Sequence, residues 1–274
     1  MVAASDDLVG AEDLVRDLRA LGVAEGDGLF VHSSLRSIGT VIGGARGLIE
    51  ALITAVGPAG LIGMPGFSRD AYDPVDQLGL DVTPDRHARI RAQVPGYDPD
   101  RSSTQQNGAV AETFRHWPGA MRSPHPTSSV VLRGPDAGDL IAPHSAEGWA
   151  TGPDTPWGRL RTRAGMKILL IGVGWNRASA LHAAESIAAH RRTKVRHLKT
   201  GPGDAPWIDA PDVADDLDRL FPLVGTAWEV TGAVAMGRLG RAECRLTGYD
   251  ALVGFAADWI GARNAADGVP AWPS

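Results

Sequence analysis

The chain has 274 residues and a formal net charge of −5, with 43% hydrophobic and 22% charged residues, the composition of a globular protein with a sizeable core. The acidic balance disfavours a nucleic-acid-binding protein, and no run approaches the roughly 18 consecutive apolar residues that a membrane-spanning helix needs. A single cysteine, Cys244, excludes an internal disulfide, and the acidic first residues lack the pattern of a signal peptide, so we expect a cytoplasmic protein.

Helical and strand patterns alternate along the chain. Helices are expected where apolar residues recur with helical spacing, and buried strands where short apolar runs end at Gly, Pro or polar residues. The predicted elements are, in order, a helix at 11–21, a strand at 28–32, a helix at 45–56, a strand at 61–64, a helix at 109–117, a strand at 128–134, a helix at 136–144, a strand at 167–172, a helix at 179–191, a strand at 195–199, a helix from Asp212, two strands within 232–246 and a helix at 250–262. This alternation predicts a layered α/β fold with one central sheet.

Residues 68–107 differ in character from the rest of the chain. They are rich in Asp, Pro, Ser and Gln and show only weak periodicity. A loop this long inside a compact domain is usually functional or disordered. We therefore expect one domain over residues 1–274 with a loop region inserted at about 68–107.

Three polar residues follow the predicted strand at 167–172 with a spacing typical of one helix face. Ser179, His182 and Glu185 stand at successive i,i+3 positions, which brings a hydroxyl, an imidazole and a carboxylate together near the carboxyl end of a strand. A histidine held by a carboxylate suits general-base work near neutral pH. An incidental pair on a surface helix explains the spacing almost as well.

Two further stretches are candidates for binding an anion. Residues 32–39 combine serines with a turn, and a helix begins soon after them, an arrangement that can cradle a pyrophosphate. In residues 122–128, Arg122 precedes two prolines that fix the loop, and an arginine can bind a phosphate. Taken alone, the first stretch is more commonly an ordinary serine-rich loop, and the second is a weak pattern that a rigid turn with an exposed arginine also explains.

Taken together, these stretches resemble the aminoglycoside 3-N-acetyltransferase (Antibiotic_NAT) family, over roughly residues 8–262. The matching stretches are LFVHSSLRSIGTVIGGARGLIEALITAVGPAGLIGMPGFS, NGAVAETFRHWPGAMRSPHPTSS, TPWGRL and KILLIGVGWNRASALHAAE. The resemblance implies a layered α/β/α fold with a central mixed sheet, distinct from the GNAT fold. It also implies transfer of acetyl from acetyl-CoA, without a metal, to the 3-amino group of a deoxystreptamine antibiotic, and hence a role in antibiotic resistance.

The resemblance also implies roles for particular residues. His182 matches the family's general base, Glu185 its carboxylate partner and Ser179 its hydroxyl-bearing residue, whereas Ala178 departs from the usual asparagine. The implied CoA contacts are His32, Ser33, Ser34, Leu35, Ser37, Arg122, Ser123 and His125. The implied carboxylates for a polycationic acceptor are Asp70, Asp73, Asp209 and Asp212.

Other functions remain compatible with the sequence. One alternative is an N-acetyltransferase of the same family that acts on a non-antibiotic amine. Another is a non-catalytic protein that binds CoA. A Ser–His–acid hydrolase fits less well, because three residues on one helix give poor triad geometry and no nucleophile elbow is present. Neither a nucleic acid nor a membrane is an expected partner, and the chain is expected to be a monomer or a homodimer.

Overall fold

The computed structural model describes residues 8–214 and 219–272. Within these residues a central sheet of seven strands has the order β10-β11-β7-β2-β4-β6-β5. Its strands are β2 (Gly28–Ser33), β4 (Leu61–Pro65), β5 (Met121–Arg122), β6 (Val130–Arg133), β7 (Met166–Ile171), β10 (Ala235–Leu239) and β11 (Ala242–Gly248). β2 pairs in parallel with β4 and β7, and the other neighbours pair antiparallel, so the sheet is mixed.

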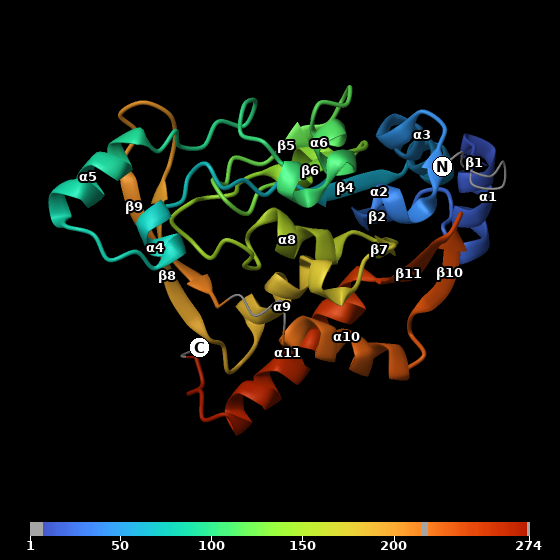
Figure 1. Ribbon diagram of the computed structural model, residues 1–274. Coiled ribbons are helices and arrows are strands. Elements are labelled where there is room, and N and C mark those ends of the chain that lie inside the picture. The colour runs from blue at the N-terminus through green and yellow to red at the C-terminus, as the bar shows by residue number, and fades with distance from the viewer. Residues whose placement is uncertain (1–7, 215–218, 273–274) are drawn as a thin grey trace, which may run out of the picture.

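Helices cover both faces of this sheet (Figure 1). The helices are α1 (Ala11–Leu21), α2 (Leu35–Ile38), α3 (Gly44–Val56), α4 (Pro74–Leu78), α5 (Pro84–Gln93), α6 (Ala109–Arg115), α7 (Ala137–Ile141), α8 (Pro156–Arg159), α9 (Ala180–Ile187), α10 (Leu220–Val230) and α11 (Tyr249–Ala266), with short 3₁₀ turns η2 (Gln105–Asn107), η3 (Leu160–Thr162) and η4 (Trp175–Arg177). This layered α/β/α arrangement confirms the predicted fold class. None of these helices, within the described residues, is long and apolar enough to cross a membrane.

Alternation along the strands divides the core into two layers. In β2, Leu29 and Val31 join the apolar cluster beneath α1, α3 and α6, whereas Phe30 joins the cluster beneath α9, α10 and α11. Successive side chains of a strand point to opposite faces, so His32 lies on the same face as Phe30. The register of β2 against β7 sets Ser33 opposite Ile171, which aligns the carboxyl ends of these two parallel strands.

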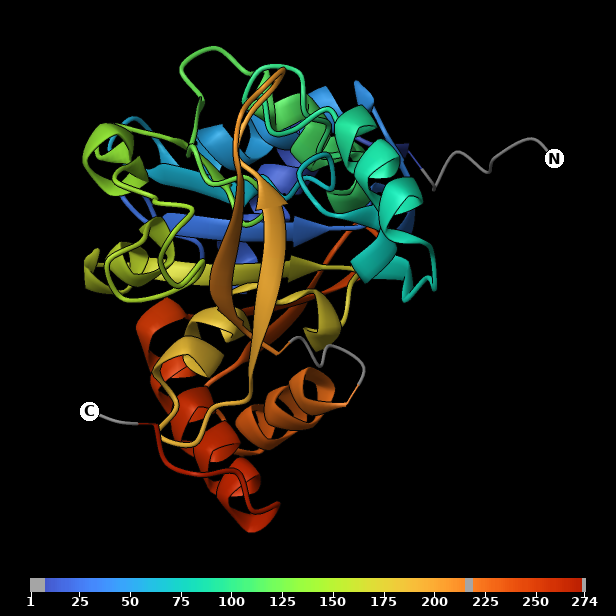
Figure 2. The same ribbon diagram turned by 90° about the vertical axis from the view of Figure 1, so that its left-hand side faces the viewer.

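A separate hairpin stands beside the sheet. It consists of β8 (Thr193–Lys199) and β9 (Trp207–Val213), and a bridge between Tyr72 and Leu198 ties it to the chain before α4. Figure 1 shows the hairpin next to α4 and α5, and Figure 2 shows it crossing in front of the central strands. A short parallel pair, β1 (Leu8–Val9) with β3 (Thr40–Val41), lies near the N-terminus.

Three local predictions are wrong. The 68–107 region contains α4, α5 and η2, and the two helices each begin with a proline after a capping position at Asp73 or Thr83. Asp212 lies in strand β9, and the helix that follows begins at Leu220; residues 215–218 lie outside the described residues. The predicted helix at 179–191 ends earlier, at Ile187, because the chain turns there into the hairpin.

Candidate active site

His182 and Glu185 form a hydrogen-bonded pair on α9, as their spacing predicts. His182 Nδ1 lies 2.9 Å from Glu185 Oε2, and both side chains are largely buried. Because a carboxylate only accepts, Nδ1 carries the hydrogen and Nε2 is the basic nitrogen of the neutral ring. The ring also packs against Phe221, with 4.9 Å between centroids, which limits the orientations that the imidazole can take.

The backbone around His182 is fixed by two hydroxyl groups. Thr151 Oγ1 and Ser186 Oγ both donate to the carbonyl oxygen of His182, at 2.9 and 3.0 Å, and the two hydroxyls lie 2.7 Å apart. The general-base candidate is therefore held from both its ring and its backbone.

His32 meets the start of α9 from the neighbouring strand. Its Nε2 accepts a hydrogen bond from the backbone N–H of Ser179 at 3.3 Å. Burial lowers the pKa of His32 to about 3, and the nearby charges of Arg177 and His182 act in the same direction. His32 is therefore a neutral acceptor that positions α9, while the Ser179 side chain lines the cavity described next.

A cavity of about 820 Å³ opens at the carboxyl ends of β2, β4 and β7; we call it the β2 cavity. His32, Ser33, Ser34 and Leu35 line it, as the resemblance implies. The exposed side chain of Arg36 also lines it, and within the described residues this side chain makes no ion pair. The amino-terminal ends of α3 and α6 contribute Gly44 and Ala109.

Ser37 lies just behind this lining and positions it. Its hydroxyl donates to Ser34 Oγ at 2.8 Å and approaches the carbonyl oxygen of Gly172 at 3.3 Å. Gly172 has a φ of +61°, and a Cβ at that position would lie 2.4 Å from Ser37 Cβ. Only glycine fits both the turn and the close approach, so the Gly172 turn after β7 is needed to seat the serine loop.

A second cavity, of about 240 Å³, lies between the 67–77 segment and the hairpin; we call it the hairpin cavity. Five residues line both cavities, namely Phe67, Gln106, Asn107, Arg177 and His182. Asn107 is held in place because its Nδ2 donates to the carbonyl oxygen of Phe67 at 3.1 Å. His182 therefore lies where the two cavities meet, accessible to molecules bound on either side.

Arg122, Ser123 and His125 are not among the described residues that line the β2 cavity, and their expected contacts with CoA stay a prediction. Arg122 Nη2 donates to the carbonyl oxygen of Gly66 at 2.5 Å, Nη1 donates to those of Ser102 and Pro99 at 2.5 and 3.1 Å, and Nε donates to Ser129 Oγ at 3.1 Å. These bonds tie the inserted region to the sheet. In the structure Arg122 therefore connects backbone segments, and its binding of a phosphate stays a prediction.

The other two residues of that motif are also bonded internally. Ser123 Oγ lies 2.9 Å from His144 Nδ1 and accepts from the backbone N–H of Val130 at 2.9 Å. His125 Nδ1 accepts from the backbone N–H groups of Thr127 and Ser128 at 3.2 and 3.0 Å. Both side chains are buried, so this stretch shapes the wall of the hairpin cavity, which Thr127 and Ser128 line.

Of the four carboxylates expected at the acceptor side, Asp212 alone lines the hairpin cavity. Asp70 lines a different cavity with Arg69 and Tyr72, and Asp209 is exposed and bonds His197. Asp70, Asp73 and Asp209 are thus not among the described lining residues of the hairpin cavity, and their expected contact with an acceptor stays a prediction.

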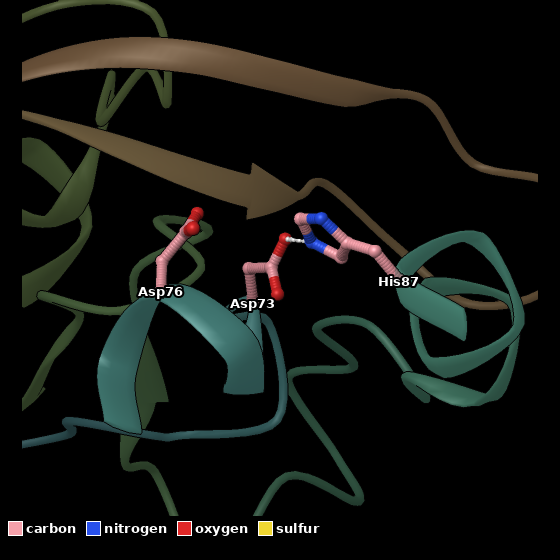
Figure 3. Close-up of side chains that lie close together, drawn as sticks. All are labelled: Asp73, Asp76 and His87. Atoms are coloured by element: carbon pink, nitrogen blue, oxygen red, sulfur yellow. Dashed lines mark hydrogen bonds and ion pairs between the residues drawn. The ribbon is translucent and has the colours of Figure 1, made fainter. Parts of the chain in front are cut away.

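Asp73 has a structural role at the start of α4. Its carboxylate caps the helix through the N–H of Val75 and accepts from Arg91 Nε of α5 at 2.5 Å. It also bonds His87 of α5 at 2.7 Å (Figure 3). Burial raises the pKa of Asp73, but the bonds from Arg91 and His87 outweigh this and leave it below its usual value. Asp76 lies close to Asp73 and His87, and these three side chains could together bind a metal ion. However, the Arg91 guanidinium already neutralises the carboxylate of Asp73.

Sequence reasoning missed the basic residues of both cavities. Arg36 lines the β2 cavity, Arg69 and Arg196 line the hairpin cavity, and Arg177 lines both. The one available signal was position, because Arg36 and Arg177 each follow a strand of the parallel pair β2 and β7. Arg196 offered no such signal, because it lies in the hairpin, and the sequence does not show that the hairpin folds against the cavity.

Cys244 does not belong to the site. It lies in β11 within the core cluster beneath α1 and α3, and burial raises the pKa of its thiol to about 11. A thiol with this pKa is protonated at neutral pH and is a weak nucleophile. The structure therefore offers no support for an acetyl-cysteine route.

Comparisons with known proteins agree with this geometry. A family model described as aminoglycoside 3-N-acetyltransferase matches residues 30–261. The SPbeta prophage-derived aminoglycoside N(3')-acetyltransferase-like protein YokD of Bacillus subtilis (strain 168) is 32% identical over 251 residues, covering 91% of each chain.

Two solved structures show similar folds with ligands present. AAC-VIa bound to sisomicin is 36% identical with a TM-score of 0.81, over 93% of this chain and 98% of that chain. AAC-IIIb in a binary complex with CoASH is 28% identical with a TM-score of 0.82, over 93% of this chain and 97% of that chain.

Proposed function

Because this chain belongs to the aminoglycoside 3-N-acetyltransferase family and is an N-acetyltransferase, we propose that it uses acetyl-CoA and a His182 general base to acetylate a primary amine. One observation carries the proposal: His182, fixed by Glu185, lines both the β2 cavity and the hairpin cavity. A base in that position reaches an amine on one side and a thioester on the other.

The acetyl donor fits the β2 cavity. Its volume of about 820 Å³ suits a large nucleotide-linked ligand, and Arg36 with the Ser33–Ser34 turn offers donors for phosphate oxygens. The CoASH-bound relative supports this assignment. The pantetheine arm of the donor would then lead past Ser179 toward His182.

The reaction is a direct transfer. The amine nitrogen attacks the thioester carbonyl carbon, the N–C bond forms, and His182 Nε2 takes the proton that the nitrogen loses. The C–S bond then breaks, and the leaving sulfur receives a proton, from the imidazolium or from water. The Ser179 hydroxyl, which lines the cavity and makes no hydrogen bond within the described residues, is the donor that we assign to the oxyanion.

The acceptor enters from the hairpin cavity. Family membership and the sisomicin-bound relative favour an amino group of an aminoglycoside, with antibiotic resistance as the cellular role. The charge of the hairpin cavity favours a second candidate, a non-antibiotic amine, because one carboxylate and three arginines line its described part. Both candidates share the same donor and base.

The experiment that tests the reaction measures two quantities on the purified protein. Calorimetry gives the affinity for acetyl-CoA, and a thiol reagent follows CoA release with gentamicin, kanamycin, neomycin, apramycin and glucosamine as acceptors. The wild type is compared with His182→Ala and with His116→Ala, a control at an exposed histidine directly after α6 that lines neither cavity.

We expect acetyl-CoA binding in all three proteins, and amine-dependent release that is lost in His182→Ala and kept in His116→Ala. Failure to bind acetyl-CoA contradicts the donor assignment. Release that continues at the wild-type rate in His182→Ala contradicts the base assignment.

A further inference from the structure

The described lining of the hairpin cavity is basic. Arg69, Arg177 and Arg196 line it, and the one carboxylate among its described lining residues is Asp212. Among these described residues positive charge predominates, and a cleft lined by one sign of charge attracts ligands of the other sign.

Asp212 is already neutralised inside the protein. It is 3% exposed, one of its oxygens accepts from Arg196 Nε and the other from the backbone N–H of Val213 at 2.8 Å. Removing a partner from a buried charged pair is costly, so a cationic ligand would gain little from this carboxylate. The Arg196–Asp212 pair therefore connects the two strands of the hairpin and leaves little negative charge to attract a ligand.

Arg69 and Arg177 differ from Arg196 in this respect. Both are exposed, and within the described residues neither guanidinium makes a hydrogen bond or an ion pair. The two residues come from opposite sides, Arg69 from the chain after β4 and Arg177 from the turn before α9, and both line the cavity that also contains His182. Guanidinium groups are the preferred partners of carboxylate and phosphate oxygens.

We propose that the acceptor is a small primary amine that also carries an oxyanion, which Arg69 and Arg177 bind while its amino group faces His182. The proposal rests on the acetyl transfer described above and changes only its acceptor. A cavity of about 240 Å³ also lies below the roughly 300–1,000 Å³ typical of sites for drug-sized ligands, which favours an acceptor of about one sugar ring.

A matched set of acceptors tests this inference. Glucosamine is the reference amine without an oxyanion. Glucosamine 6-phosphate adds a phosphate, muramic acid adds a carboxylate, and neomycin is a polycation. Calorimetry with CoA present gives the affinity for each, and CoA release from acetyl-CoA gives each kcat/KM. The two anionic compounds separate a phosphate-bearing from a carboxylate-bearing acceptor.

The variants are Arg69→Gln, Arg177→Gln, their combination, and Arg89→Gln as the matched control. Arg89 is an exposed arginine of α5 that lines neither cavity. Arg177 also lines the β2 cavity, so the KM for acetyl-CoA is measured in each variant. Arg69→Gln must leave that KM unchanged.

We expect at least one anionic amino sugar to bind and react at least tenfold better than glucosamine or neomycin. The double variant should lose this preference by tenfold or more, and Arg89→Gln should keep it. Equal affinity for glucosamine and both anionic derivatives, no detectable binding of either anionic compound, tighter binding of neomycin, or an unchanged preference in the double variant would each overturn the inference.

Failure of the proposed reaction has a different signature. In that case no amine releases CoA, or the release does not depend on His182. If the acceptor inference alone fails, His182-dependent release persists and its preference runs toward neutral or polycationic amines.

Discussion

The backbone N–H of Ser179 donates a hydrogen bond to Nε2 of His32, across 147 positions of sequence. This bond joins the start of α9 to the end of β2, and therefore fixes the helix that carries the candidate base against the strand that opens the β2 cavity. A protonated His32 has no lone pair on Nε2 and cannot accept this bond. The arrangement thus depends on a histidine that stays neutral.

Acid should weaken the fold through buried histidines. The pKa is about 3 for His32 and about 4 for His144, both lowered mainly by burial, against about 6.5 in an unfolded chain. Below pH 6.5 the unfolded state binds more protons, so the stability from each histidine is complete above about pH 6.5 and is lost as the pH falls toward its folded pKa. The expected loss is about 1.4 kcal/mol per pH unit for each histidine.

Urea unfolding between pH 5.0 and 7.5 measures this dependence. His144→Gln should reduce the slope of the unfolding free energy against pH by close to one proton near pH 5.5, whatever its effect on stability at pH 7.5. His116→Gln, at an exposed histidine, should leave the slope unchanged. A wild-type stability that does not change between pH 7 and 5 would contradict this assignment.

The roles of His182 and Glu185 predict unequal losses in turnover. His182→Gln removes the proton acceptor, and kcat should fall by roughly 10²–10⁴. Glu185→Gln keeps a hydrogen-bond acceptor near Nδ1 and removes only its charge, so kcat should fall less, by roughly tenfold. Steady-state kinetics at saturating acetyl-CoA, with its affinity measured separately, separate the two effects; a larger loss in Glu185→Gln would reverse the two roles.

Arg36 should bind a phosphate of the donor. Arg36→Gln removes an exposed guanidinium from the β2 cavity, and a hydrogen bond to a charged group contributes about 1.5–3 kcal/mol, so the KM for acetyl-CoA should rise at least tenfold. S-acetylpantetheine carries no phosphate, and its KM should be the same in wild type and variant. Equal increases with both donors would mean that Arg36 shapes the cavity instead. Arg101→Gln, at an arginine that lines neither cavity, is the control.

Arg122 should contribute to stability rather than to donor binding. Lysine cannot replace the fork of nitrogens that bonds Gly66, Pro99, Ser102 and Ser129, so Arg122→Lys should lower the unfolding free energy by about 1–3 kcal/mol. Calorimetry should give wild-type affinity for acetyl-CoA below the melting transition. A selective loss of that affinity with an unchanged Tm would return Arg122 to the donor site.

The sequence predicts those parts of the fold whose signal is local. Apolar runs identify the central strands, and Gly43-Gly44 with Gly57 bounds α3 almost to the residue. The inserted helices α4 and α5 are missed because α5 buries no residue and so shows no apolar stripe. Their one local signal is a capping position followed by proline at Asp73-Pro74 and Thr83-Pro84.

The residues of the site also divide into those with a local sequence signal and those without one. The i,i+3 spacing of His182 and Glu185 predicts their hydrogen bond, and the loop after β2 lines a cavity as expected. Asp212 and Arg196 form their pair through the register of a hairpin, where Lys194 stands opposite Asp212, and no linear pattern encodes that register. Arg122 matches a motif, yet the carbonyl oxygens that surround it come from distant loops.

The hairpin that borders the second cavity shares no strand pairing with the central sheet in the described structure. The bridge between Tyr72 and Leu198 and side-chain contacts, such as Lys199 Nζ with the carbonyl oxygen of Val94, connect it to the inserted region. The sheet, by contrast, carries His32 and leads directly into the helix of His182. Substitutions in the hairpin can therefore reshape one wall of the hairpin cavity without breaking the strand pairing that supports His32 and the helix of His182. Arg69, Arg177 and His182 lie outside the hairpin, so that wall can vary in evolution or in design while these three residues stay in place.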